Sequence, residues 1–236
     1  MAGNFVARKT PTRGSAGSAL AAATNLAEEL RTVPWLMQAG FQGNVYIAGH
    51  GLEETATDGI ITTLEETTPT FMLMAPALGT IVIPIWAEVR MHTEGGAAPD
   101  AYLSYVGVDR SSAPAYTSLD KLQLNGSFTS SLAIAGKTIS SVTAITSAQT
   151  VLVARRANIL DNVISVEGAT TSPGQELMGR NSNALEFNFW EKFGGAFQLY
   201  AGRSVMFHTV TGTTVSAYSC TFVWAEVPSA TYDHIA

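Results

Sequence analysis

Residues 80–91 read Thr-Ile-Val-Ile-Pro-Ile-Trp-Ala-Glu-Val-Arg-Met, and their alternation decides the fold class. Apolar residues recur at every second position, which is the period of a half-buried β-strand. One face carries Ile81, Ile83, Ile85, Ala87, Val89 and Met91, and the other carries Val82, Pro84, Trp86, Glu88 and Arg90. Because Pro84 has no amide proton to donate to a sheet, this strand is predicted to lie at an edge or to contain a bulge.

The chain beyond Gly40 repeats this period of two. Leu185, Phe187 and Phe189 alternate with Glu186 and Asn188, and the last long strand is expected to place on one face Val215, Ala217, Val223, Ala225 and Val227. Further strands are expected at residues 45–48, 70–74, 101–108, 131–135, 151–155, 197–200 and 205–210. Gly, Pro, Ser and Asn clusters separate these segments, with no helix pattern between them. The sequence therefore predicts an all-β, antiparallel sandwich or barrel, with residues 41–236 as a single domain.

Residues 1–40 are predicted to form an extended N-terminal arm followed by one short helix. The arm is mainly Gly, Ser, Thr, Ala and Pro, too poor in apolar side chains to order itself alone. Residues 19–31 are rich in Ala, Leu and Glu, with Asn25 and Glu28 at the spacing of a capping pair. Pro34 is expected to stop this helix.

Composition limits the partners of the chain. Of its 236 residues, 46% are hydrophobic and 14% are charged, and the formal net charge is −6. A negative body argues against wholesale nucleic-acid binding, which depends on Lys and Arg neutralising phosphates. Because Arg8, Lys9 and Arg13 are the only charged residues before Glu28, the arm is the one region expected to contact a genome or neighbouring subunits.

The sequence predicts no catalytic residue, metal site or cofactor, and the chain is not expected to be an enzyme. Its histidines match no metal-binding spacing; they are His50, His92, His208 and His234. His50, between two glycines, is expected in a turn, and His208 on the wet face of a strand. No serine lies in a nucleophile-elbow motif, and the single cysteine, Cys220, excludes an intrachain disulfide.

Targeting and membrane segments are not predicted either. No apolar run approaches the roughly 20 residues that a membrane-spanning helix needs. The first residues lack the apolar centre of a secretory signal, so synthesis in a cytoplasm is expected.

Large apolar residues on both faces of one strand suggest contacts between subunits. Phe222 and Trp224 alternate with Val223 and Ala225, which are expected to point inward. The outward face then needs a cover, which another layer, the N-terminal segment or a second copy of the chain would provide. Candidate subunit-interface residues are Trp35, Leu36, Met37, Trp86, Phe222 and Trp224. A stacking platform for sugars or bases, built from Trp86, Trp190, Tyr218 and Trp224, is the alternative.

Two stretches resemble a known class of protein. Residues 70–76, Thr-Phe-Met-Leu-Met-Ala-Pro, with residues 79–85, Gly-Thr-Ile-Val-Ile-Pro-Ile, resemble the early paired strands of jelly-roll virion proteins of bacterial viruses. Residues 199–205, Leu-Tyr-Ala-Gly-Arg-Ser-Val, and 219–226, Ser-Cys-Thr-Phe-Val-Trp-Ala-Glu, are similar to their closing hairpin. The resemblance implies a β-sandwich of jelly-roll type that self-assembles into a capsid or shell, found in the virion with other virion proteins.

Two other functions stay open. A viral fibre, spike or receptor-binding protein would form a compact trimer or ring with exposed aromatic loops. A non-viral carbohydrate-binding or cupin-like domain would present a pocket for sugar or metal. Cupins carry paired histidines, for which the surroundings of His50 and His208 offer no counterpart.

Overall fold

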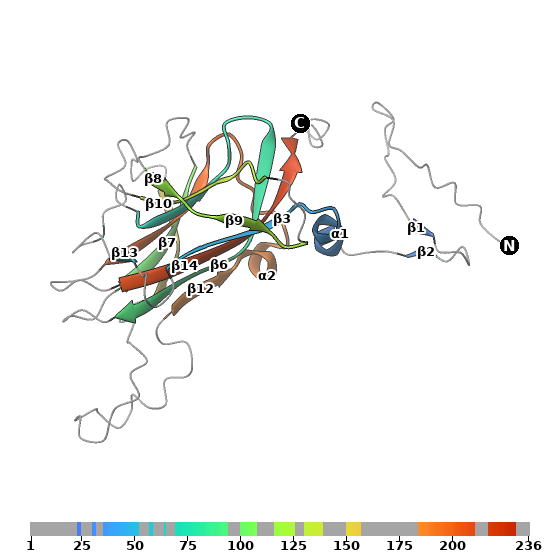
Figure 1. The fold of residues 1–236 in the computed structure, drawn as a ribbon. Coiled ribbons are helices and arrows are strands. Elements are labelled where there is room, and N and C mark those ends of the chain that lie inside the picture. Colours follow the sequence, from blue (N-terminus) through green and yellow to red (C-terminus); the bar gives the residue numbers. More distant parts are fainter. Residues whose placement is uncertain are drawn as a thin grey trace, which may run out of the picture.

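The chain folds as an all-β sandwich of two antiparallel sheets (Figure 1). The computed structural model describes residues 23–24, 30–31, 35–51, 57–58, 64, 69–93, 100–107, 116–125, 130–138, 150–156, 184–210 and 217–229. None of the helices in these segments is long and apolar enough to cross a membrane.

The first sheet contains the longest strands of the described chain. Its order is β12 (Ala184–Asn188), β6 (Thr80–Thr93), β14 (Ala217–Pro228), β3 (Val45–His50) and β9 (Lys121–Gln123), and β4 (Thr57–Asp58) also pairs with β14. The second sheet has the order β11 (Thr150–Arg156), β7 (Asp100–Val106), β13 (Ser204–Val210), β5 (Phe71–Met74), β10 (Ile134–Thr138) and β8 (Tyr116–Ser118).

The terminal strands of the two sheets lie together at the two sides of the sandwich. On one side β11, the end of the second sheet, contacts β12, the end of the first. On the other side β8 and β9 end their sheets and follow each other along the chain. In Figure 1, β14 and β6 lie between β3, beside β9, and β12, in agreement with the strand order of the first sheet.

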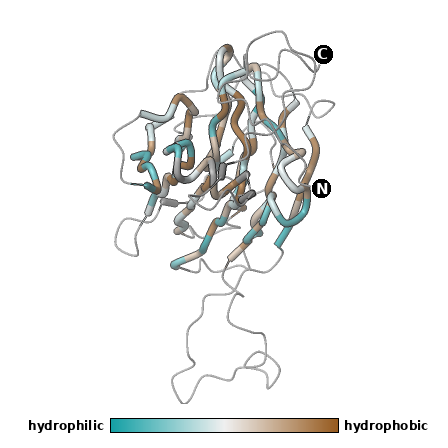
Figure 2. Tube along the Cα trace, turned by 90° about the vertical axis from the view of Figure 1, so that its right-hand side faces the viewer, coloured by the Kyte–Doolittle hydropathy of each residue, from teal (hydrophilic) through white to brown (hydrophobic). Residues whose placement is uncertain are grey.

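Side chains from both sheets fill the space between them. The largest are fully buried and include Phe71, Leu103, Phe207, Tyr218, Phe222 and Trp224. Figure 2 shows hydrophobic residues, in brown, concentrated along the strands of the two layers. This burial supplies the main driving force for folding, at about 25 cal/mol per Å² of apolar surface removed from water.

A bulge in β6 divides the apolar face predicted for residues 80–91. Val223 pairs with Trp86 while Trp224 pairs with Pro84, so Ile85 is the extra residue. A one-residue shift moves later side chains to the opposite face. Ala87, Val89 and Met91 therefore lie in the inter-sheet core with Val82, whereas Ile81, Ile83 and Ile85 belong to a separate cluster. The single predicted face was wrong, and Pro84 occupies a bulge in an interior strand, one of its two predicted positions.

The side chains of β14 point to the faces opposite to those predicted. Phe222 and Trp224 lie in the core between the sheets, fully buried by their own chain. Val223 and Ala225 lie on the outer face, in the cluster that contains Ile81 and Ile83. Both faces of β14 are apolar, as the sequence suggested, but the larger residues point into the space between the sheets.

The N-terminal helix lies elsewhere than predicted. Within residues 19–31 the structure describes two short strands, β1 (Ala23–Thr24) and β2 (Leu30–Arg31), which pair antiparallel. An isolated helix of that length is marginal without packing. The helix α1 (Trp35–Phe41) instead begins directly after Pro34, and proline is well tolerated at a helix start. Leu36 and Ala39 pack α1 onto the outer face of the first sheet.

The other strand predictions hold with local exceptions. The strand expected at 131–135 lies at Ile134–Thr138, and residues 197–200 make only an isolated bridge from Leu199 to Val82. A second helix, α2 (Phe189–Phe193), was not predicted. Its signal was present, since the Asn188 side chain caps the Glu191 amide and Gly194 ends the helix in the left-handed conformation.

Candidate subunit-interface surfaces

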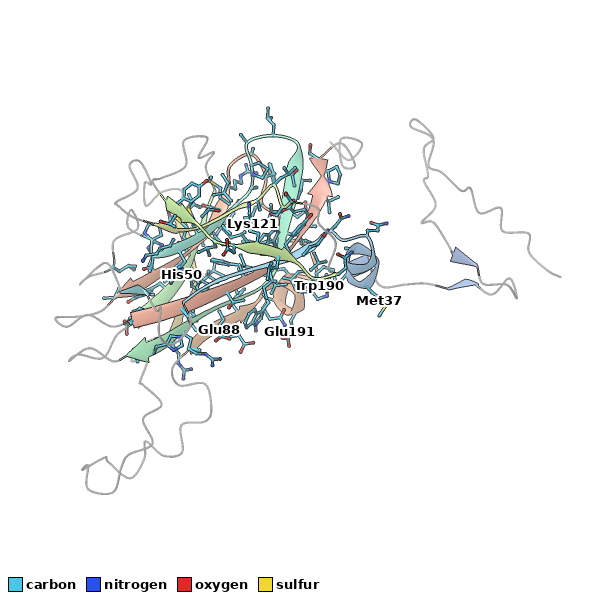
Figure 3. The ribbon with its side chains drawn as sticks, in the orientation of Figure 1. Met37, His50, Glu88, Lys121, Trp190 and Glu191 are labelled. Carbon is cyan, nitrogen blue, oxygen red and sulfur yellow. The ribbon has the colours of Figure 1, made fainter. Side chains whose placement is uncertain are left out.

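The predicted site residues are scattered through the structure. Arg8, Lys9 and Arg13 lie outside the described residues. Trp35 begins α1, and its side chain is not among those described, whereas Met37 is more than half exposed and projects from the helix (Figure 3). Phe222 and Trp224, expected at an interface, are buried in the core between the sheets.

Trp86 and Trp190 are partly exposed. The Trp86 indole donates a hydrogen bond to Glu186 Oε1 at 2.7 Å, across the β6–β12 pair. Trp190 belongs to α2, where its ring leaves no room for a Cβ at Gly195. Because Tyr218 and Trp224 are fully buried, the four predicted aromatic residues do not form one stacking platform.

In the part of the chain that the structure describes, the strand β9 is the last strand of the first sheet and carries exposed leucines. It ends the strand order of that sheet, next to β3. Leu122, opposite Ile47 in the register, is 66% exposed, and Leu124 is also more than half exposed. The Leu124 amide donates to the Val45 carbonyl at 3.0 Å, which keeps this segment beside β3 after the strand ends.

A buried carboxylate holds a third leucine near β9. Glu226 on β14 accepts hydrogen bonds from the amides of Leu132 at 3.0 Å and Ala133 at 3.1 Å, from the Trp224 indole at 2.9 Å and from the Ser131 hydroxyl. Glu226 is itself buried, so these donors compensate the loss of water around its charge.

Lys121 on β9 also forms hydrogen bonds with residues 131–133. Its ammonium group donates to the carbonyls of Ser131 at 3.2 Å and Ala133 at 2.8 Å. The intervening Leu132 is therefore held beside β9 with more than half of its side chain exposed. We refer to Leu122 and Leu124, which share one face because they are two positions apart, as the β9 patch.

The strand β11 is a second edge with exposed apolar residues. It ends the second sheet and carries Val151, 60% exposed, and Leu152, more than half exposed. Their side chains alternate between the two faces of the strand, and we refer to the edge that carries both as the β11 patch. A bulge lies between Leu152 and Ala154, and bulges are one way in which sheet edges resist uncontrolled pairing.

The two arginines at the end of β11 differ in their contacts. Arg155 forms an ion pair with Asp100 at 2.7 Å and lies over the Tyr102 ring, 5.2 Å from its centroid. Arg156 is exposed at the end of the strand. Charges at a free edge disfavour unspecific pairing with other chains.

The histidines are separated in the described structure. His208 is buried, with Nε2 2.8 Å from the Ser104 hydroxyl, so its predicted place on a wet face was wrong. His50 is the last residue of β3 instead of a turn residue, and burial, with the nearby charge of Lys137, lowers its pKa. His92 Nε2 lies 2.7 Å from the Ser219 hydroxyl. His234 falls outside the described residues.

Two further observations concern metal binding and thiol chemistry. Among the described residues, no three His, Cys, Asp or Glu side chains gather where they could hold a metal ion. Cys220 is buried in the core, and this burial raises the pKa of its thiol well above the ordinary value. The folded chain therefore keeps Cys220 in its less reactive protonated form.

Comparisons with protein-family models, with curated proteins and with solved structures found no match for this chain. Function is therefore inferred from strand pairing and from the exposed apolar side chains. Sequence reasoning missed both patches. Leu122 and Leu124, two positions apart before Asn125, were the available signal for the β9 edge, because residues spaced by two share a face of an extended strand.

Proposed function

We propose that the sandwich is a jelly roll. Eight strands carry the pattern, in chain order β3, β5, β6, β7, β11, β12, β13 and β14. The first pairs with the eighth, the second with the seventh, the third with the sixth and the fourth with the fifth.

Such nested pairing is that of one long hairpin of four strand pairs. The hairpin is rolled so that β14 meets β6 in one sheet and β13 meets β7 in the other. A rolled hairpin of this kind contains the two Greek keys of a jelly roll. The strands β8, β9 and β10 come between the fourth and fifth strands of the pattern and extend both sheets on one side.

We further propose a structural role, as a self-assembling capsid or shell subunit of a virus, in the virion and in contact with other virion proteins. Because jelly rolls also occur in lectins and cupins, topology alone does not select this function. The observation that carries it is the exposed apolar residues on a terminal strand of each sheet. Free edges with exposed apolar side chains are sites where chains associate.

The charge distribution is compatible with this role. Only 14% of the residues are charged, which leaves few charges to keep copies apart. In this proposal Arg8, Lys9 and Arg13 contact neighbouring subunits or a genome. Nucleic acid is expected to bind only through these arm residues.

Light scattering across protein concentration tests the proposal. We expect species that grow with concentration in discrete steps or reach megadalton mass, and particles in electron micrographs of the same samples. A 24.9-kDa monomer at every concentration would overturn self-assembly. A stable trimer that grows no further would instead favour a fibre or spike.

A further inference from the structure

The β9 patch and the β11 patch lie on opposite lateral sides of one molecule. β9 ends the first sheet on the side that β8 also occupies, whereas β11 contacts β12 at the opposite end. Each copy therefore presents one apolar edge on each side, from different sheets. Such an arrangement allows every copy to meet two neighbours through two different surfaces.

The exposed charges beside the two patches have opposite sign. Asp120 is exposed directly before β9, while the neighbouring Lys121 ammonium donates to carbonyls of its own chain. Arg156 is exposed at the end of β11. The β9 edge thus presents an acid and the β11 edge a base, which is the complementarity expected of two surfaces that meet each other.

The spacing of charge and apolar residues also agrees between the edges. Suppose that β9 of one copy pairs antiparallel with β11 of the next, with Asp120 opposite Arg156. Leu124 is then opposite Leu152. The extra residue of the β11 bulge moves this match by one position, to Val151, which is still within the patch. Pairing each edge with its own copy would leave Asp120 and Arg156 without opposite charges.

We infer that copies of this chain associate head to tail, with the β9 patch of one against the β11 patch of the next. The inference rests on the proposed function, since it names the contact through which subunits assemble. Two different surfaces in contact form a heterologous interface, which adds copies without limit unless the rotation closes a ring. The occupant of each edge is thus a second copy of this chain.

Two single variants of the full chain test this geometry. Leu122→Glu places a charge in the β9 patch, and Val151→Glu places one in the β11 patch. Head-to-tail contact predicts that each variant alone is monomeric in light scattering. An equimolar mixture should form a one-to-one dimer and nothing larger, because the intact β11 patch of one variant binds the intact β9 patch of the other.

Leu78→Glu is the matched control. Leu78 is 88% exposed in the turn between β5 and β6, which are interior strands of their sheets, so this variant should assemble as the unchanged protein does. Circular dichroism of all three variants verifies that they remain folded.

Failure of the head-to-tail contact and failure of the proposed function would give different results. If Leu122→Glu forms a homodimer through its intact β11 edge, contact is symmetric and the inference is wrong, although self-assembly stands. Assembly of either variant like the unchanged protein, or a mixture that stays monomeric, also overturns it. A monomeric unchanged protein would instead overturn the proposed function.

A charge reversal provides a second route that does not depend on the glutamate variants folding. Asp120→Arg or Arg156→Asp alone should weaken association about fivefold. The chain that carries both changes should recover it, because acid and base have exchanged edges. Failure of the double variant to recover would contradict the head-to-tail contact.

Discussion

The interior of the sandwich and its two edges both contain large apolar side chains, yet their contributions to stability differ. In the interior, the rings of Phe207 and Phe222 stack at 5.5 Å and those of Tyr46 and Trp224 at 6.0 Å, with both pairs buried. At the edges, Leu122 and Val151 remain mostly in water. Free energy follows the area removed from water, so the interior side chains stabilise the fold and the exposed edge side chains contribute little to its stability.

Truncation of an interior ring should have the largest effect. Phe222→Ala is expected to lower the free energy of unfolding by about 3–5 kcal/mol, through lost burial and the cavity left behind. Urea unfolding followed by tryptophan fluorescence measures this. Val223→Ala, on the half-buried outer face of the same strand, is the control and should cost about 1 kcal/mol. If Phe222→Ala abolished assembly with no loss of stability, Phe222 would belong to an interface instead.

Removal of the carboxylate that joins the interior to the β9 edge should rank next. Glu226→Ala leaves the buried Trp224 indole and two backbone amides without their acceptor, and should cost about 3 kcal/mol. Glu186→Ala removes an exposed carboxylate with one indole partner and should cost less than about 1 kcal/mol. Equal costs for the two variants in urea unfolding would show that the Glu226 network does not hold the 131–133 segment.

Alkaline pH should weaken the interior through Cys220. Burial raises the pKa of this thiol in the folded chain, so the unfolded chain loses its proton first, near pH 8.5. The stabilisation is complete below that pH and is lost above it, by up to about 1.4 kcal/mol per pH unit. Burial also raises the pKa of Tyr46 and Tyr102, which adds to the loss near pH 10.

Unfolding of the unchanged protein and of Cys220→Ala between about pH 7 and 10 separates the thiol from the tyrosines. The variant should lose less stability between about pH 8.5 and 9.5, where the thiol of the unfolded chain ionises. Identical pH profiles for the two proteins would contradict the effect of burial on Cys220.

Changes at the edges should have the smallest effect on stability. Leu122→Glu and Val151→Glu are expected to change the free energy of unfolding of the monomer by less than about 0.5 kcal/mol, because these side chains are mostly exposed. Urea unfolding at a concentration where the unchanged protein is monomeric makes the comparison. A loss of several kcal/mol would place these residues in the folded core and remove the distinction between interior and edge.

The periodicity in the sequence predicted strands well and their faces less well. Residues 80–93 form a strand, but the bulge at Ile85 exchanges the two faces part-way along it. Alternation in one segment contains no information about an unpaired residue, which depends on the register with β14. In the same way, Phe222 and Trp224 were assigned to the wrong face because both faces of β14 are apolar.

The exposed edges were not anticipated from the sequence. Sequence patterns directed attention to tryptophans and to the arm, whereas the exposed edges come from the less conspicuous segments 121–124, 131–133 and 150–152. Lys121 and Glu226 lie far apart in sequence, and both form hydrogen bonds with residues 131–133, which local sequence patterns do not reveal.

The sequence by itself determined the all-β class, the positions of most strands and the chain's capacity to bury a large core, because these depend on local periodicity and composition. Tertiary structure alone decided the order of the strands, the face on which each side chain lies and the residues left at free edges. Those features depend on pairing between segments far apart in the chain, and a one-residue change of register is enough to exchange buried and exposed side chains.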